Sequence, residues 1–252
     1  MLKAAVIGAW AKDGEQSSGE QSSMDVNGSV QGDGSFGCIF TSPLKGSYDY
    51  GYTGLTLTCW AKFLPNTKGH FCTFGGDNTG FSIGHGARGD NGKNGNNINA
   101  LANVRWWLPS DYTVSDGLWH HYVLVSYRLR GSSEGHGSHV FVDGIRKLVS
   151  EFGSSDTNAT LSLDNSNITL LGVYDGEHSR FLTGNVTRFC IYDSSKPFSF
   201  IQDDFSLGNK APSLDGLIHY YNGASADGKL IDQIGGCDMT SMNGALLSND
   251  IP

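Results

Sequence analysis

Alternation between apolar and polar residues is the clearest pattern in the chain, and it is strongest between residues 116 and 149. Residues 119–127 and 138–142 both alternate with a period of two, which is typical of half-buried strands. Asp143-Gly144 then offers the residue types of a tight hairpin turn before a third strand at 145–149. The segment therefore predicts a β-meander.

The same pattern recurs along the rest of the chain and predicts an all-β domain. Further strands are predicted at residues 1–11, 36–42, 55–63, 70–75, 80–85, 98–108, 168–172 and 184–193. Residues 196–206 have apolar groups in roughly helical spacing, so we expect a short helix or turn there. The expected core includes Trp60, Trp119, Val123, Val125, Phe141, Leu170, Phe189 and Ile191.

Three segments carry a family resemblance: DGLWHH at 116–121, LTLTCWAKF at 55–63 and GNVTRFCIYD at 184–193. Together they resemble the laminin G-like jelly rolls, within the wider concanavalin A-like lectin and glucanase group. The resemblance implies an all-β fold, a two-sheet antiparallel jelly-roll sandwich. It also implies that the pair His120-His121 is structural, with the two rings on opposite faces of one strand.

The end of the chain is out of order relative to that family. GLIHYYNGASADGKLIDQIGG, residues 216–236, resembles the segment with which such modules usually begin. Either the jelly roll is permuted and this strand closes its own sheet, or the strand completes a sheet on a neighbouring subunit. We favour closure within the chain.

The domain organisation follows from length and composition. A chain of 252 residues can form one large sandwich, which we place at 36–252. Residues 1–35 are expected to hold a first strand and a polar arm, because 12–35 is rich in Gly, Ser, Gln and Asp. The arm is either a surface loop or a contact with another subunit, and we expect the N-terminal segment to make the intermolecular contact.

Charge and cysteine usage exclude several function classes. The net charge of −8, with acidic residues scattered singly, argues against a nucleic-acid partner. No run reaches the eighteen apolar residues of a membrane helix, so membrane insertion is not expected. The first eleven residues are short for a signal peptide. Five cysteines without a CxxC motif are expected to be reduced and buried, which indicates synthesis in a cytoplasm.

Catalysis is not expected. Hydrolysis of a glycosidic bond requires two carboxylates across a cleft, and the ExDxxE strand motif of sandwich glucanases is absent. The five Glu residues are never paired at i, i+2 in an apolar strand, and no GxSxG motif marks a serine nucleophile.

Two binding sites are candidates. Sugar rings stack on aromatic faces while amides bind their hydroxyls. The candidate sugar-binding residues are Trp106, Trp107 and Tyr112, with Asn94, Asn96, Asn97 and Asn99 nearby. The alternative is that these aromatic residues cap the core or a subunit contact, one of the two tryptophans facing inward. Calcium is common in the resembling group, and its candidate ligands here are Asp77, Asn78, Asp90 and Asp175. The alternative for these four is that they simply favour tight turns.

The favoured function is a non-enzymatic recognition or assembly module. Free cysteines and the lack of a signal peptide suggest a bacteriophage virion surface protein, made in the host cytoplasm as a decoration, fibre or receptor-binding component. Its expected partners are other virion proteins or further copies of itself, together with surface glycans. The alternatives are a glycan-active enzyme (a glycosidase or lyase), a purely structural capsid or tail cement, and a cytoplasmic location.

Overall fold

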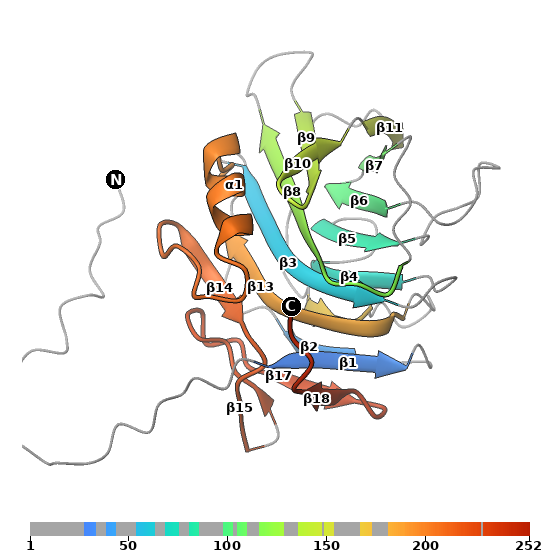
Figure 1. Ribbon diagram of the computed structural model, residues 1–252, viewed down its shortest axis with the longest axis vertical. Coiled ribbons are helices and arrows are strands. Elements are labelled where there is room, and N and C mark those ends of the chain that lie inside the picture. The colour runs from blue at the N-terminus through green and yellow to red at the C-terminus, as the bar shows by residue number, and fades with distance from the viewer. Residues whose placement is uncertain are drawn as a thin grey trace, which may run out of the picture.

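The alternating segments form two antiparallel sheets in a computed structural model. The model describes residues 28–33, 39–43, 54–63, 69–75, 81–85, 98–102, 105–109, 116–128, 136–147, 149–153, 167–172, 181–227 and 229–252. Among these residues the fold is all-β except for one helix, α1 (Phe198–Ser206). Figure 1 shows the two layers of strands with α1 on one side.

The first sheet, sheet A, has eight strands in the described residues, in the order β10-β9-β8-β3-β13-β1-β18, with β14 also paired to β13. Its strands are β1 (Ser29–Asp33), β3 (Leu55–Phe63), β8 (His120–Arg128), β9 (His136–Val142), β10 (Ile145–Lys147), β13 (Thr183–Tyr192), β14 (Leu217–Tyr221) and β18 (Leu246–Ser248). The predicted turn at Asp143-Gly144 joins β9 to β10. Both turn residues have positive φ, 51° and 72°, as a two-residue hairpin of this type requires.

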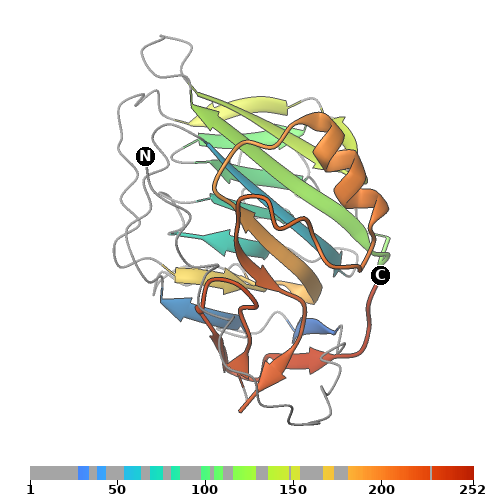
Figure 2. The ribbon, with the colours of Figure 1, turned by 90° about the vertical axis from the view of Figure 1, so that its left-hand side faces the viewer.

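The second sheet, sheet B, has ten strands in the described residues, in the order β11-β7-β6-β5-β4-β12-β2-β17-β16-β15. Its strands are β2 (Ile39–Pro43), β4 (Gly69–Phe74), β5 (Phe81–His85), β6 (Ile98–Ala102), β7 (Arg105–Pro109), β11 (Val149–Gly153), β12 (Asn167–Leu170), β15 (Ser225–Ala226), β16 (Lys229–Leu230) and β17 (Met239–Met242). Figure 2 shows strands of the two sheets crossing at an angle.

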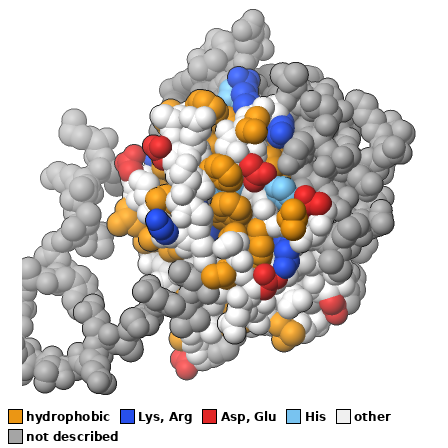
Figure 3. All heavy atoms as spheres, in the orientation of Figure 1, with side chains coloured by type: hydrophobic (Ala, Val, Ile, Leu, Met, Phe, Trp, Pro, Cys, Tyr) orange, Lys and Arg blue, Asp and Glu red, His pale blue; other side chains and the backbone are white. Residues whose placement is uncertain are grey.

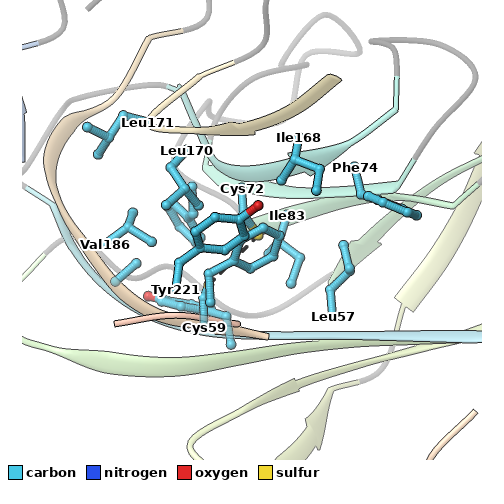
Figure 4. Packing of buried hydrophobic residues seen from close by; sticks show 14 of the residues in the cluster. Leu57, Cys59, Cys72, Phe74, Ile83, Ile168, Leu170, Leu171, Val186 and Tyr221 are labelled. Atoms are coloured by element: carbon cyan, nitrogen blue, oxygen red, sulfur yellow. Dashed lines mark hydrogen bonds between the residues drawn. The ribbon is translucent and has the colours of Figure 1, made fainter. Parts of the chain in front are cut away.

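The main core lies between the sheets because alternate side chains of each strand face inward. Leu57 and Cys59 of β3 point toward Cys72 of β4 and Ile83 of β5, and all four side chains are fully buried. Figure 4 shows these residues together with Leu170, Val186 and Tyr221. The Sγ atoms of Cys59 and Cys72 are 3.9 Å apart and both thiols are free, as expected for reduced, buried cysteines.

A second apolar cluster lies on the outer face of sheet A, under α1. It comprises Val123, Val125 and Phe141 from sheet A and Ile201 from the helix. Trp60 also lies on this face, with its ring stacked on that of Phe205 at 5.8 Å. The predicted helix at 196–206 is confirmed, and it explains why both faces of β8 are apolar.

Several sequence-based expectations need correction. Trp119 is only half-buried, outside the core, although the other seven predicted core residues are buried. Residues 98–108 form two strands, β6 and β7, and residues 145–149 divide between β10 in sheet A and the start of β11 in sheet B. Residues 29–33, expected in the polar arm, form β1 and pair with β13.

Strand β14, in the segment 216–236 that resembles the start of the family's modules, pairs with a strand of its own chain, as favoured from the sequence. One edge of β13 pairs with β1 at residues 183–186 and with β14 at residues 189–192. A bulge separates the two stretches, and Arg188 there has a φ of 48°. In the described part of the chain, no helix has the length and apolar character to cross a membrane.

Candidate functional site

A pocket of about 210 Å³ opens where β1, β3 and β13 lie side by side in sheet A. Its lining combines amide, hydroxyl and charged groups with one aromatic ring. The lining residues are Gln31, Gly32, Lys62, Phe63, Thr183, Gly184, Asn185 and Asp250. The register aligns Lys62 and Gln31 on either side of Asn185, which places these three polar side chains on the outer face of the sheet.

Gly184 allows the strands to meet closely beside this pocket. A Cβ atom at this position would lie 2.8 Å from Phe63 Cα and still closer to the carbonyl oxygen of Lys62. Only glycine fits such a close approach of two backbones. Asn185 is buried next to it, and its Nδ2 donates a hydrogen bond to Ser29 Oγ at 3.1 Å, so its amide is held in a fixed orientation.

The C-terminal segment brings a carboxylate to the pocket. Asp250 accepts hydrogen bonds from Lys62 Nζ and from Trp119 Nε1, the latter at 3.1 Å. Lys62 Nζ also lies 5.6 Å from the centre of the Trp119 ring, within cation–π range. The hydrogen bond from Lys62, followed by that from Trp119, lowers the pKa of Asp250. The pocket therefore carries a fixed ion pair with an indole beside it.

His120 forms a separate clasp at the first residue of β8. Its Nδ1 lies 2.7 Å from Asp143 Oδ2, and its Nε2 lies 3.2 Å from both carboxylate oxygens of Asp116. The hydrogen bond with Asp143 raises the pKa of His120, although burial opposes the rise. The clasp joins the loop before β8 to the hairpin between β9 and β10, which is a structural role.

His121 points to the opposite face and lies under α1. Its Nε2 is 3.0 Å from Asp204 Oδ2, and Arg188 Nη2 donates to Asp204 Oδ1 at 2.7 Å. All three side chains are buried almost completely. The structure thus agrees with the expected structural role of the His120-His121 pair, with the rings on opposite faces, and neither imidazole reaches the pocket lining.

The structure does not describe the side chains of the sites predicted from sequence. Trp106 and Trp107 are placed on β7 and pair with Phe152 and Glu151 of β11. Their side chains lie outside the described residues, as do Tyr112, Asn94, Asn96 and Asn97, and the calcium candidates Asp77, Asn78, Asp90 and Asp175. The proposed sugar and calcium sites therefore remain predictions.

Sequence reasoning missed the pocket because its residues come from four distant segments. Lys62 is simply the last polar position of β3, Gln31 lies in the expected arm, and Asp250 is near the end of the chain. The pairing of β13 with both β1 and β3 brings Gln31 and Lys62 together, and the C-terminal segment adds Asp250 through its contact with Lys62. Trp119 was one available indication of this site, because a tryptophan at the start of a strand can lie outside the core and use its indole N–H on the surface.

Surface chemistry around this site is mixed rather than dominated by one sign of charge. Figure 3 shows Lys or Arg, Asp or Glu and His side chains among hydrophobic ones on the described part of the face that carries α1. The pocket lining contains a single carboxylate, that of Asp250. Hydrolysis of a glycosidic bond requires a pair of carboxyl groups, of which the described lining supplies one.

Comparison with known proteins relates the chain to others by fold. No family model and no curated protein matches the sequence. A solved structure from Bacteroides ovatus, described as a candidate carbohydrate-binding protein, matches with a TM-score of 0.62 at 16% identity, over 88% of this chain and 60% of that one. The heptameric SAP-like pentraxin of Limulus polyphemus matches with a TM-score of 0.59 at 10% identity, over 88% of this chain and 95% of that one. Mouse laminin α1 domains LG4-5 give a TM-score of 0.44 at 13% identity, over 69% and 44%.

This chain therefore spans about 60% of the length of the Bacteroides protein and nearly the whole of the pentraxin. At 10–16% identity these likenesses concern the fold and leave the function open. Two antiparallel sheets with one short helix make the chain similar to the jelly-roll sandwiches of the concanavalin A-like kind.

Proposed function

We propose that this protein is a non-catalytic carbohydrate-binding module and that the pocket beside Gly184 is a sugar-binding site. The observation that carries the proposal is the polar lining of this pocket on a sandwich of the jelly-roll type. The likeness to the Bacteroides structure, described as a candidate carbohydrate-binding protein, supports the same function by analogy of fold.

The lining suits sugar hydroxyls, which both donate and accept hydrogen bonds. The amide of Gln31 offers both donors and an acceptor, and Lys62 offers a charged donor. Thr183 Oγ1 donates to Asp33 O at 3.0 Å, which leaves its oxygen lone pairs to accept from a ligand. The three groups come from three neighbouring strands, so their spacing is held by the sheet.

The size of the pocket limits the ligand. A volume of about 210 Å³ is below the roughly 300–1,000 Å³ of pockets for drug-sized ligands. It therefore fits one sugar residue, such as the end of a chain, better than an internal stretch of polysaccharide. Trp119 lies next to the pocket through its hydrogen bond to Asp250 and offers an apolar surface for a second sugar residue.

The proposed location of this protein is independent of its proposed ligand. A position on the surface of a phage virion remains our proposal from the sequence, with no support from the structural neighbours. A glycan-binding module would serve there as a receptor-binding component, and further copies of the chain or other virion proteins would be its assembly partners.

A glycan array probed with the labelled full chain tests the function, and calorimetry with the best ligand tests the site. Lys62→Ala should raise Kd about 10- to 100-fold, because a hydrogen bond from a charged group contributes roughly 1.5–3 kcal/mol. Gln31→Ala should raise Kd about 2- to 10-fold, from the loss of a neutral hydrogen bond. Lys229→Ala and Gln233→Ala are matched controls, since both residues are exposed and neither belongs to the lining.

The outcomes separate the alternatives. Absence of binding to every glycan at millimolar concentration would overturn the proposed function and favour a structural cement. Binding that both pocket variants leave unchanged would overturn the site, and Trp106→Ala and Trp107→Ala would then test the aromatic site predicted on β7. Release of reducing sugar from a polysaccharide panel would overturn the non-catalytic assignment.

A further inference from the structure

Three chemically distinct donors meet inside the C-terminal part of the chain. His219 lies on β14, Asp232 follows β16 and Cys237 precedes β17. One imidazole nitrogen, one carboxylate oxygen and the thiol sulfur all lie within 4.8 Å of one another. The three residues are 1%, 5% and 0% exposed. In the described part of the chain they are the one such group of His, Cys and acidic residues.

The carboxylate in the middle is held in place by the backbone. Asp232 Oδ1 accepts hydrogen bonds from Tyr220 N at 3.0 Å and Ile234 N at 3.2 Å. Asp232 Oδ2 accepts one from Cys237 N at 3.1 Å and lies 2.6 Å from His219 Nδ1. The hydrogen bond from Cys237 N fixes the start of β17 next to the carboxylate. The carboxylate is thus held in place by the fold, whereas His219 Nδ1 and Asp232 Oδ2, in contact at 2.6 Å, would have to move apart to admit an ion.

These contacts have two interpretations. In the first, the cluster is only a hydrogen-bonded clasp that closes the turn between β16 and β17. That interpretation accounts for Asp232 and His219, but it gives the Cys237 side chain no role beyond filling space. A hydrogen-bonded clasp also does not need three donors of different elements to converge.

We propose instead that His219 Nδ1, Asp232 Oδ2 and Cys237 Sγ form a binding site for a single zinc ion. Nitrogen, carboxylate and thiolate are the ligands that Zn²⁺ takes in proteins, whereas Ca²⁺ and Mg²⁺ take oxygen ligands. The metal would replace the proton between His219 Nδ1 and Asp232 Oδ2. That proton passes through solvent to Nε2, so that a neutral imidazole binds the metal through Nδ1, and the thiol of Cys237 releases its proton to solvent.

The turn between Asp232 and Cys237 separates the three donors from solvent. Gln233, Ile234, Gly235 and Gly236 are exposed, so one short turn separates the buried donors from solvent. Gly235 packs against the imidazole, because a Cβ atom there would lie 2.5 Å from His219 Cε1. With three protein ligands, a zinc ion here would take its fourth ligand from water.

Cobalt(II) titration of the chelator-treated full chain tests the proposal, because Co²⁺ takes the place of Zn²⁺ and reports its ligands by absorption. We expect one Co²⁺ per chain, with a thiolate-to-cobalt charge-transfer band that Zn²⁺ abolishes on addition. Cys237→Ala should remove this band and raise the Kd for Zn²⁺ by more than the 10- to 100-fold that second-shell losses cost. Cys190→Ala is the matched control, since Cys190 is a fully buried thiol on β13 outside the cluster.

A second measurement needs no variant. Mild denaturant with iodoacetamide labels thiols as the structure opens, and mass spectrometry reports each site. Added Zn²⁺ should slow labelling of Cys237 at least tenfold more than labelling of Cys59. Equal protection of both cysteines, or a cobalt band that persists in Cys237→Ala, would overturn the site. Binding without a thiolate band would also overturn it, and none of these results bears on sugar binding.

Discussion

Arg188 and Asp204 form a buried ion pair that joins β13 to α1, with Arg188 Nη2 donating to Asp204 Oδ1 at 2.7 Å. The second oxygen of Asp204 faces His121, and Arg188 Nε donates to Lys210 O at 2.7 Å. Arg188 occupies the bulge at which β13 changes its partner from β1 to β14. The pair therefore ties the helix to the sheet at the point where the C-terminal strand joins.

Replacing Asp204 by Asn should destabilise the protein strongly. The substitution removes the negative charge but leaves the guanidinium of Arg188 buried, and breaking one half of a buried ion pair costs about 3–5 kcal/mol. Urea unfolding followed by circular dichroism measures the change. Asp203→Asn is the control, because Asp203 is exposed on the same helix and should change the unfolding free energy by less than about 0.5 kcal/mol. A loss below 1 kcal/mol in Asp204→Asn would show that the pair contributes little.

The same carboxylate makes stability depend on pH in the acid range. Burial alone would raise the pKa of Asp204, but hydrogen bonds from His121 and Arg188 lower it from 3.8 to about 2. A lowered pKa in the folded state stabilises the fold above pH 4, and the contribution is lost as pH falls from 4 to 2. It corresponds to roughly 2 kcal/mol. The stability gap between the wild type and Asp204→Asn, measured by urea unfolding, should therefore narrow between pH 5 and pH 2. A constant gap over this range would contradict the assignment.

The strands were predictable from sequence because alternate side chains along each strand point to opposite faces of the sheet. Leu55 to Phe63 alternates between the core and the helix-covered face, and the predicted bounds of β3 match the structure. Trp60 and Val123 were correctly predicted as buried, but their partner is α1, which periodicity alone does not reveal. Alternation of apolar and polar residues with a period of two predicts which side chains are buried, but it does not predict which element covers them.

The features that sequence patterns did not predict depend on contacts between residues far apart in the chain. Lys62 and Asp250 are 188 residues apart, and their contact exists only because the C-terminal segment passes over β3. His219 and Cys237 lack the short spacing of familiar zinc motifs, so no local pattern marks them. Trp119 was misplaced in the core because a family resemblance indicates the residue type at a position but not its exposure.

His120 should make stability depend on pH near neutrality. The hydrogen bond with Asp143 raises its folded pKa above the usual 6.5, and Asp116 acts in the same direction. A raised pKa gives stabilisation that is fully present below the unfolded pKa and is lost as pH rises through the folded value. The melting temperature of the wild type should therefore exceed that of His120→Gln more at pH 5.5 than at pH 8.5. His139→Gln serves as a control of opposite sign, because burial lowers the pKa of His139, so the advantage of the wild type over this variant should grow with pH. A difference from His120→Gln that grows with pH would reverse the assigned sign.

Removing the C-terminal strands should unfold the domain. Tyr221, Leu230 and Met239 contribute fully buried side chains to the core between the sheets, and Tyr221 OH donates to Cys237 O at 2.8 Å. Deletion of 216–252 therefore leaves an open core and an unpaired edge on β13, and cooperative thermal unfolding should disappear. Deletion of 249–252 is the control, because it removes only the partly exposed Lys62–Asp250 pair and the hydrogen bond from Trp119 to Asp250, at a cost of about 0–1 kcal/mol for the pair. A peptide of residues 214–252 added to the longer truncation should restore the native spectrum. Cooperative unfolding of the longer truncation by itself would mean that the final strand is not needed to close the sandwich.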